Sequence, residues 1–175
     1  SDLGLHTEAI GLVQRGLLAT GIIQPDKVED TRYADYNFYL TNVSGRRLSF
    51  EEFKGQTIFL NFWATWCPPC IAEMPDIEDL YQKKGQEVAF VMISLDENRD
   101  KARAFVDRKG YDLPIYFLES GLPNTYDTHS IPTTYVISPS GKLVVENHGM
   151  AKYDSESFRL LLDQLNQSAI NSLPN

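Results

Sequence analysis

The spacing of apolar and polar residues changes near Tyr36 and divides the chain into two parts. Before that point, residues 4–20 carry apolar side chains at helical spacing, and Gly21 stands where a helix would end. Residues 22–35 are polar, contain a proline and carry charges of both signs, as expected of a connector. We therefore predict that residues 1–35 form an N-terminal helix followed by a connector.

From residue 36 onward the pattern predicts alternating strands and helices. Residues 36–42 alternate, and residues 44–49 follow as a turn and a short strand, which predicts an N-terminal β-hairpin. Residues 57–64 and 87–94 are almost continuously apolar, as expected of strands buried on both faces of a sheet. The other predicted elements are helices at 68–84, 98–109 and 154–167 and strands at 113–119, 133–138 and 142–148.

The order of these elements is β-α-β-α-β, then a hairpin, then a helix. Such an order predicts an α/β fold with a mixed central sheet and helices on both of its faces. We expect one domain over residues 36–168 and a C-terminal tail over residues 169–175. The length of 175 residues suits a single domain with a sizeable core.

Composition and charge narrow the classes of function. The formal net charge of -8 argues against a nucleic-acid partner, because such proteins usually carry a basic patch. No apolar run reaches the roughly 18 residues that span a bilayer. The chain begins at Ser1 without a methionine, so we expect that a preceding segment has been removed.

The two cysteines of the chain lie close together, in the run NFWATWCPPCIAEMP over residues 61–75. A disulfide that closes so short a loop constrains the unfolded chain very little, so a purely stabilising role is a poor explanation. Cys67 is predicted at the N-cap of a helix, where the helix dipole lowers the thiol pKa to roughly 7 in thioredoxin-type sites. Cys70 lies one turn later, which predicts an exposed attacking thiol at Cys67 and a resolving thiol at Cys70.

The prolines between the cysteines bear on the direction of electron flow. Pro68 suits the first position of the helix, where its missing N–H would be unpaired in any case. Pro69 removes one of the two N–H groups that usually bond an N-cap side chain. A thiolate at Cys67 is then stabilised only moderately, whereas strong oxidants have a very stable reduced form. This indicates a reducing rather than an oxidising pair.

Two other uses of the cysteine pair remain open. Half of a zinc site would need further ligands, but His6, His129 and His148 are scattered along the chain. Two buried structural cysteines are the other alternative. The position of the pair, after a buried strand and at the start of a helix within a β-α-β unit, favours the redox interpretation.

Two separated motifs, FLNFWATWCPPC and SIPTTYVISPSGKLV, resemble signatures of the thioredoxin superfamily. More narrowly, they resemble the TlpA/ResA/CcmG-like thiol-disulfide oxidoreductases of bacterial envelopes, over residues 36–167. The resemblance implies a thioredoxin-like fold in which residues 100–118 form the central insert of this branch. It also implies a redox-active disulfide and no cofactor or metal.

The resemblance assigns roles to individual residues. It makes Cys67 the nucleophile and Cys70 the resolving cysteine. Asn61 replaces the buried aspartate of cytosolic thioredoxin, and Glu73 matches the acid that this branch places after the second cysteine. Because Glu73 follows Cys70 by one helical turn, a partly buried carboxylate with a raised pKa could take the Cys70 proton. The residues expected to contact the client are Trp66, Pro68, Pro69, Ile131 and Pro132, with Ile131–Pro132 a cis peptide.

The resemblance further implies a protein-disulfide reductase that acts on disulfide-containing client proteins outside the cytoplasm, with apocytochrome c as the first candidate. A membrane thiol donor would return the pair to its reduced form. The expected location is the bacterial periplasm or cell envelope, with a signal anchor before Ser1 holding the protein outward on the inner membrane.

Two alternatives within related folds were weighed. Copper chaperones of thioredoxin fold use two cysteines and a later histidine, which here would be Cys67, Cys70 and His129. Those proteins usually space their cysteines C-x-x-x-C, unlike this chain. A peroxidase of the peroxiredoxin type is disfavoured because Leu60 and Ala64 stand where its proline and threonine or serine would be.

Overall fold

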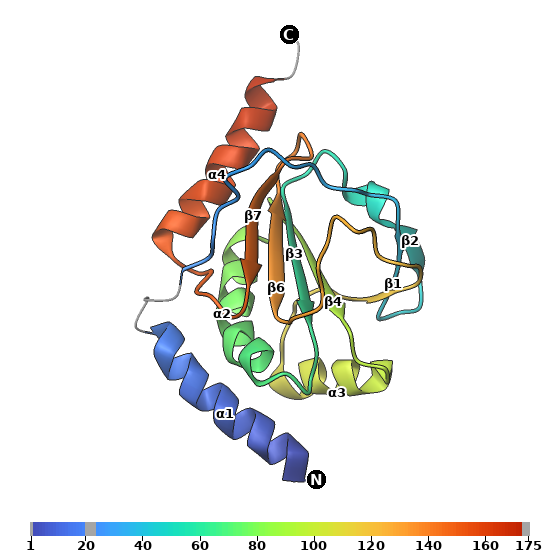
Figure 1. Ribbon diagram of the computed structural model, residues 1–175, viewed down its shortest axis with the longest axis vertical. Coiled ribbons are helices and arrows are strands. Elements are labelled where there is room, and N and C mark those ends of the chain that lie inside the picture. The colour runs from blue at the N-terminus through green and yellow to red at the C-terminus, as the bar shows by residue number, and fades with distance from the viewer. Residues whose placement is uncertain (1, 20–23, 173–175) are drawn as a thin grey trace.

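The computed structural model describes residues 2–19 and 24–172 and contains a seven-stranded mixed sheet in the order β2-β1-β5-β4-β3-β6-β7 (Figure 1). The helices are α1 (Asp2–Ala19), the 3-10 helix η1 (Phe50–Phe53), α2 (Pro68–Lys84), α3 (Arg99–Lys109) and α4 (Glu156–Asn171). The strands are β1 (Tyr39–Asn42), β2 (Arg47–Ser49), β3 (Ile58–Trp63), β4 (Ala89–Ser94), β5 (Ile115–Leu118), β6 (Thr133–Ile137) and β7 (Leu143–His148). The predicted α/β fold, its N-terminal hairpin and its central insert are confirmed.

Strand β3 lies at the centre of the sheet and leads into the cysteine motif. It pairs in parallel with β4 and antiparallel with β6. All six of its residues are buried, as the continuous apolar run predicts. The cysteines therefore follow the carboxyl end of a rigid central strand.

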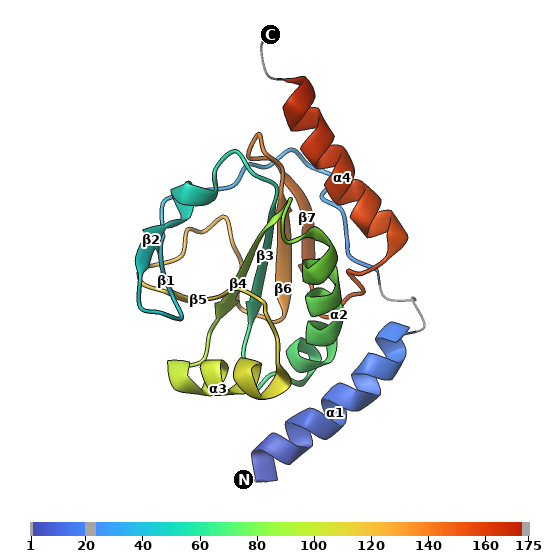
Figure 2. The same cartoon turned by 180° about the vertical axis from the view of Figure 1, so that it is seen from behind.

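Helices α2, α3 and α4 cover one face of the sheet (Figures 1 and 2). This differs from the prediction that helices cover both faces. The crossovers β3-α2-β4 and β4-α3-β5 step through the sheet in the same direction, so their common right-handedness places both helices on one side. The other face is covered by Phe50 of η1 and by aromatic residues from loops, including Tyr36 and Tyr126.

Two segments differ in detail from the sequence prediction. Helix α4 continues to Asn171, beyond the predicted residue 167 and into the predicted tail, because no glycine or proline occurs before Pro174 to stop it. The connector forms single bridges along the edge strand β7, at Lys27 with Val145, and to the residue before this strand, at Tyr33 with Lys142. It thereby covers an edge that would otherwise be open.

Helix α1 lies outside the sheet layers and packs across α2 near the start of that helix (Figure 2). Gly11 lies at this contact, where a Cβ atom would stand 3.5 Å from both the Pro68 carbonyl oxygen and the Ile71 side chain, an ordinary van der Waals distance. Its predicted C-terminal boundary at Gly21 falls outside the described residues. Among those residues, no helix combines the length and the apolar character needed to cross a membrane. The proposed domain bounds remain predictions.

Candidate active site

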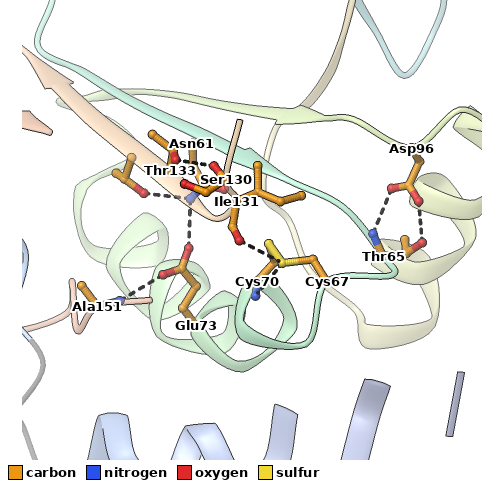
Figure 3. The surroundings of a disulfide bond; sticks show 11 residues. Asn61, Thr65, Cys67, Cys70, Glu73, Asp96, Ser130, Ile131, Thr133 and Ala151 are labelled. Atoms are coloured by element: carbon orange, nitrogen blue, oxygen red, sulfur yellow. Dashed lines mark hydrogen bonds between the residues drawn. A yellow bond between two sulfur atoms is a disulfide. The ribbon is translucent and has the colours of Figure 1, made fainter. Parts of the chain in front are cut away.

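The two cysteines form a disulfide at the N-terminus of α2 (Figure 3). Cys67 is the N-cap residue, as predicted, and its Sγ accepts a hydrogen bond of 3.3 Å from the backbone N–H of Cys70. The two residues between them, Pro68 and Pro69, have no N–H to donate. In the first three positions of the helix, only Cys70 therefore presents a backbone donor to the Cys67 sulfur.

Cys67 is more enclosed than the sequence suggested. Its residue exposure is only 4%, so the prediction of an exposed attacking sulfur is wrong for this oxidised form. The carbonyl oxygen of Ile131 lies 3.6 Å from the Cys67 Sγ and covers it from the side of β6. Trp66 is 59% exposed and is the accessible side chain next to the disulfide.

The loop before β6 lies beside the disulfide. The Ile131–Pro132 peptide bond is cis, as predicted. Two hydrogen bonds fix this loop: the Thr133 hydroxyl donates to the Ser130 carbonyl at 2.7 Å, and the Gly149 N–H donates to the Pro132 carbonyl at 2.8 Å. The Ile131 backbone is thus held beside the cysteines at the start of a rigid strand.

Glu73 is fully enclosed behind the disulfide. Its exposure is 1%, and its carboxyl group accepts hydrogen bonds from Asn61 Nδ2 at 3.0 Å and from the Ala151 N–H at 3.1 Å (Figure 3). Burial raises the pKa of Glu73 to about 8, because the two hydrogen bonds only partly offset the loss of water, and the charge of Asp76 raises it further. The predicted partly buried acid is in fact completely buried.

The polar surroundings of Glu73 continue into the sheet. Asn61 Nδ2 also donates to the Thr134 hydroxyl at 2.9 Å. The Tyr153 ring is buried in the same region, and its hydroxyl pKa is raised well above the usual value by burial and by the charge of Glu73. With two charge-sensitive groups so close and so deeply buried, the neutral form of Glu73 is strongly favoured at neutral pH.

We expect this buried acid to make the oxidised protein less stable as the pH rises from about 4.5 to about 8. In the unfolded chain Glu73 releases its proton near the usual pKa of 4.5, whereas the folded chain holds it up to about 8. Between these values the folded state binds more protons, so raising the pH favours unfolding. At about 1.36 kcal/mol per pH unit, the group contributes a loss of roughly 5 kcal/mol.

Urea unfolding of the oxidised protein at several pH values measures this loss. Glu73→Gln should remove most of the slope, while Asp79→Asn, on an exposed position of the same helix, should leave it unchanged. Equal slopes in the wild type and the Glu73→Gln variant would contradict the assignment.

A buried carboxylate that the sequence analysis did not identify holds the loop between β3 and α2. Asp96 is 7% exposed and accepts hydrogen bonds from the Thr65 N–H at 3.0 Å and from the Thr65 hydroxyl at 2.5 Å. The hydroxyl of Ser94 also donates to it, at 2.8 Å. Thr65 lies two residues before Cys67, so Asp96 positions the approach to the nucleophile. An acid two residues after a buried parallel strand was the signal available in the sequence.

Replacing Asp96 with alanine should destabilise the protein by about 2 kcal/mol, because the buried donors of Thr65 and Ser94 lose their acceptor. Thermal or urea unfolding measures this change. Asp96→Asn keeps one acceptor oxygen and should cost less. A loss no larger than that of an exposed control such as Asp79→Asn would show that Asp96 does not hold the loop.

His129 is not brought to the cysteines. Its side chain is 98% exposed, and its Nδ1 lies 2.6 Å from Asp127 Oδ1. Among the described residues, no three His, Cys, Asp or Glu side chains gather as a metal site. The geometry therefore gives no support to the copper alternative with Cys67 and Cys70.

Comparison with known proteins agrees with this site. Residues 25–159 match the redoxin family. The chain belongs to this family. The ResA thiol-disulfide oxidoreductase of Halalkalibacterium halodurans is 37% identical over 130 residues, which cover 72% of this chain and 73% of that protein. Other relatives of the same name are covered over 62% to 66% of their own length.

Solved structures show the same fold. A thiol-disulfide oxidoreductase from Bacteroides vulgatus superposes with a TM-score of 0.62 at 29% identity, covering 73% of this chain and 91% of that one. The exposed lipoprotein thioredoxin of Streptococcus pneumoniae gives a TM-score of 0.58 at 27% identity, covering 74% and 98%. This redoxin is thus a thiol-disulfide oxidoreductase of the ResA/CcmG-like branch of the thioredoxin superfamily.

Proposed function

We propose that this redoxin reduces disulfides in client proteins outside the cytoplasm through the Cys67–Cys70 pair. The observation that carries the proposal is the placement of the disulfide: it caps α2, faces the cis-Pro132 loop and has the buried acid Glu73 behind it. Each of these parts has a separate task in the exchange of a disulfide.

The exchange proceeds in two steps. The Cys67 thiolate attacks one sulfur of the client disulfide, which forms a Cys67–client disulfide and releases the other client sulfur as a thiolate. The Cys70 thiolate then attacks Cys67 Sγ, forms the Cys67–Cys70 disulfide and releases the second client thiolate. Two electrons pass from the pair to the client, and the released thiolates take up protons.

The ionised form of Glu73, which is the minority form at neutral pH because its pKa is about 8, takes the Cys70 proton in the second step. It follows Cys70 by one turn of α2, and its raised pKa of about 8 is close to the usual thiol value of about 8.5. A proton acceptor works best when its pKa lies near that of the donor and near the working pH. The hydrogen bonds from Asn61 and Ala151 keep the carboxyl group oriented in the protein interior.

The weak stabilisation of Cys67 supports the reducing direction. Of the residues that begin α2, only Cys70 offers an N–H to the sulfur, and the first turn contains no basic side chain. A thiolate held by so few donors is less stable than that of a strong oxidant. We therefore expect the Cys67–Cys70 pair to donate electrons to a client disulfide more readily than the pair of a strong oxidant would.

The client backbone is expected to pair with Ile131 beside Pro132, and its side chains to contact Trp66, Pro68 and Pro69. The exposure of Trp66 and the fixed cis-Pro132 loop support this arrangement. A membrane dithiol donor would then reduce the Cys67–Cys70 disulfide after each turnover. Apocytochrome c, with its paired cysteines, is one client class.

We place the protein in the bacterial periplasm or cell envelope, held by an anchor that precedes Ser1. The likeness to an exposed lipoprotein thioredoxin supports this location. So does the use of the pair in disulfide exchange, since protein disulfides persist in oxidising compartments.

Turnover with a peptide disulfide tests the proposal. The protein, with a small dithiol as electron source, should reduce an internal disulfide in a synthetic peptide repeatedly, and Cys67→Ser should abolish the reaction. A matched Ser130→Ala change, which lies in the loop before β6 and keeps the backbone carbonyl that accepts from Thr133, should retain it. A Cys67→Ser variant as active as the wild type would overturn the proposal.

A further inference from the structure

A cleft of about 460 Å³ opens beside Trp66 and is lined by residues of α1 and α3. Figure 2 shows where these two helices lie. Its volume falls in the range of ordinary ligand sites, roughly 300–1,000 Å³. The residues that matter for its chemistry are Glu8, Trp66, Ile71, Lys101, Phe105 and Arg108. The cleft is separate from the cis-Pro132 loop, which contacts the disulfide from the other side.

The cleft has an apolar base. Trp66, Ile71 and Phe105 line it, and the Trp66 side chain is largely exposed there. Helix α1, which packs against α2, forms one wall through Thr7 and Glu8. The carboxyl group of Glu8 ties this wall to the end of α3 through ion pairs of 3.5 Å with Arg108 and 3.4 Å with Lys109.

The rim of the cleft is positive, although the whole chain carries a net charge of -8. Lys101 and Arg108 line it, and Lys109 stands next to it on α3. Glu8 is the carboxylate that opposes them, and it is shared between two of the cations. Lys101 forms no ion pair with another described residue, so its charge is available to a ligand.

We propose that this cleft binds the segment next to the target cysteine of a client, and that it favours segments carrying acidic residues beside an apolar one. The inference rests on the proposed function. The cleft begins at Trp66, the residue before Cys67, and each extended residue advances about 3.3 Å. A client held by Cys67 can therefore lay residues a few positions away over Trp66 and bring their carboxylates to Lys101 and Arg108.

Reduction rates of three peptides test this preference. The peptides share one internal disulfide and one apolar neighbour, and differ only in flanking aspartates, asparagines or lysines. At low ionic strength the wild type should reduce the acidic peptide about tenfold faster than the basic one, and added salt should narrow this ratio. This result would run against the net charge of the protein, which alone would favour the basic peptide.

Reversing the charge of one lysine at a time tests which lysine causes the preference for acidic peptides. Lys101→Glu breaks no ion pair among the described residues and should abolish or reverse the ratio of the acidic-peptide rate to the basic-peptide rate. Lys142→Glu makes the same change of charge at the β6–β7 turn, at the far end of the sheet, and should leave the preference intact. Far-UV circular dichroism confirms that both variants fold.

The outcomes separate the two proposals. Equal wild-type rates for the acidic and basic peptides, or equal effects of Lys101→Glu and Lys142→Glu, would overturn the cleft as a client site. Failure to reduce even the neutral peptide would instead overturn the proposed function.

Discussion

Replacing Cys70 with serine should stop turnover after one covalent event and leave Cys67 joined to the client. The variant keeps the N-cap position of Cys67 and the N–H of residue 70 that bonds its sulfur, so the first attack proceeds. The second step fails because a serine hydroxyl is not a thiolate at neutral pH and cannot displace a sulfur from a disulfide. The trapped complex is detected as a band that disappears when a reductant is added.

Cys67→Ser is the matched control for this trap. Cys70 lies inside α2 and lacks the N-cap position that stabilises a Cys67 thiolate, so it should not replace Cys67 as the attacking thiol, and no complex should accumulate. A complex formed equally by both variants would mean that either sulfur can attack. In that case the division of roles between the two cysteines would be wrong.

Glu73→Gln should slow the resolving step by about 10² or more at neutral pH, the range typical of a lost proton acceptor. The amide can still accept from Asn61, so the packing behind the disulfide is largely kept, but it cannot take the Cys70 proton. Decay of a preformed Cys67–client disulfide, followed by stopped flow, isolates this step.

The pH profile distinguishes a chemical from a merely structural role of Glu73. In the wild type the decay rate should rise with pH and level off above about 8, where Glu73 becomes ionised. In Glu73→Gln it should continue to rise through the range in which the Cys70 thiol itself loses its proton. Asp79→Asn, on the same helix, should follow the wild-type profile; a variant profile parallel to the wild type at every pH would contradict the role of Glu73.

The sequence predicted the core of this site because the relevant signals are local. A buried strand, an N-cap cysteine and two prolines lie within one short run, so the bounds of α2 and the capping role of Cys67 were predicted correctly. The second motif likewise predicted the cis bond at Pro132.

The features that were missed depend on contacts between distant segments. The burial of Cys67 depends on Ile131, which lies 64 positions later in the chain. Glu73 accepts a hydrogen bond from the Ala151 N–H, and the Thr65 N–H donates to Asp96; in both cases the partner lies far along the chain. No periodicity reports such contacts, because each arises only when β3, β4 and β6 are placed side by side in the sheet.

The position of α1 is a further example. Its apolar spacing predicted a helix but not the surface against which it packs. The contact of α1 with α2 joins segments that are far apart in the chain, so no local signal in the sequence reports it.

The reduction potential of the Cys67–Cys70 pair tests the central claim most directly. The protein is equilibrated with glutathione buffers in the absence of metal, and the oxidised fraction is measured after acid quenching. A value near that of thioredoxin, about -270 mV, is the predicted result and identifies a reductant. A value near about -120 mV, typical of a strong oxidant, would contradict the account and make disulfide formation the function of this site.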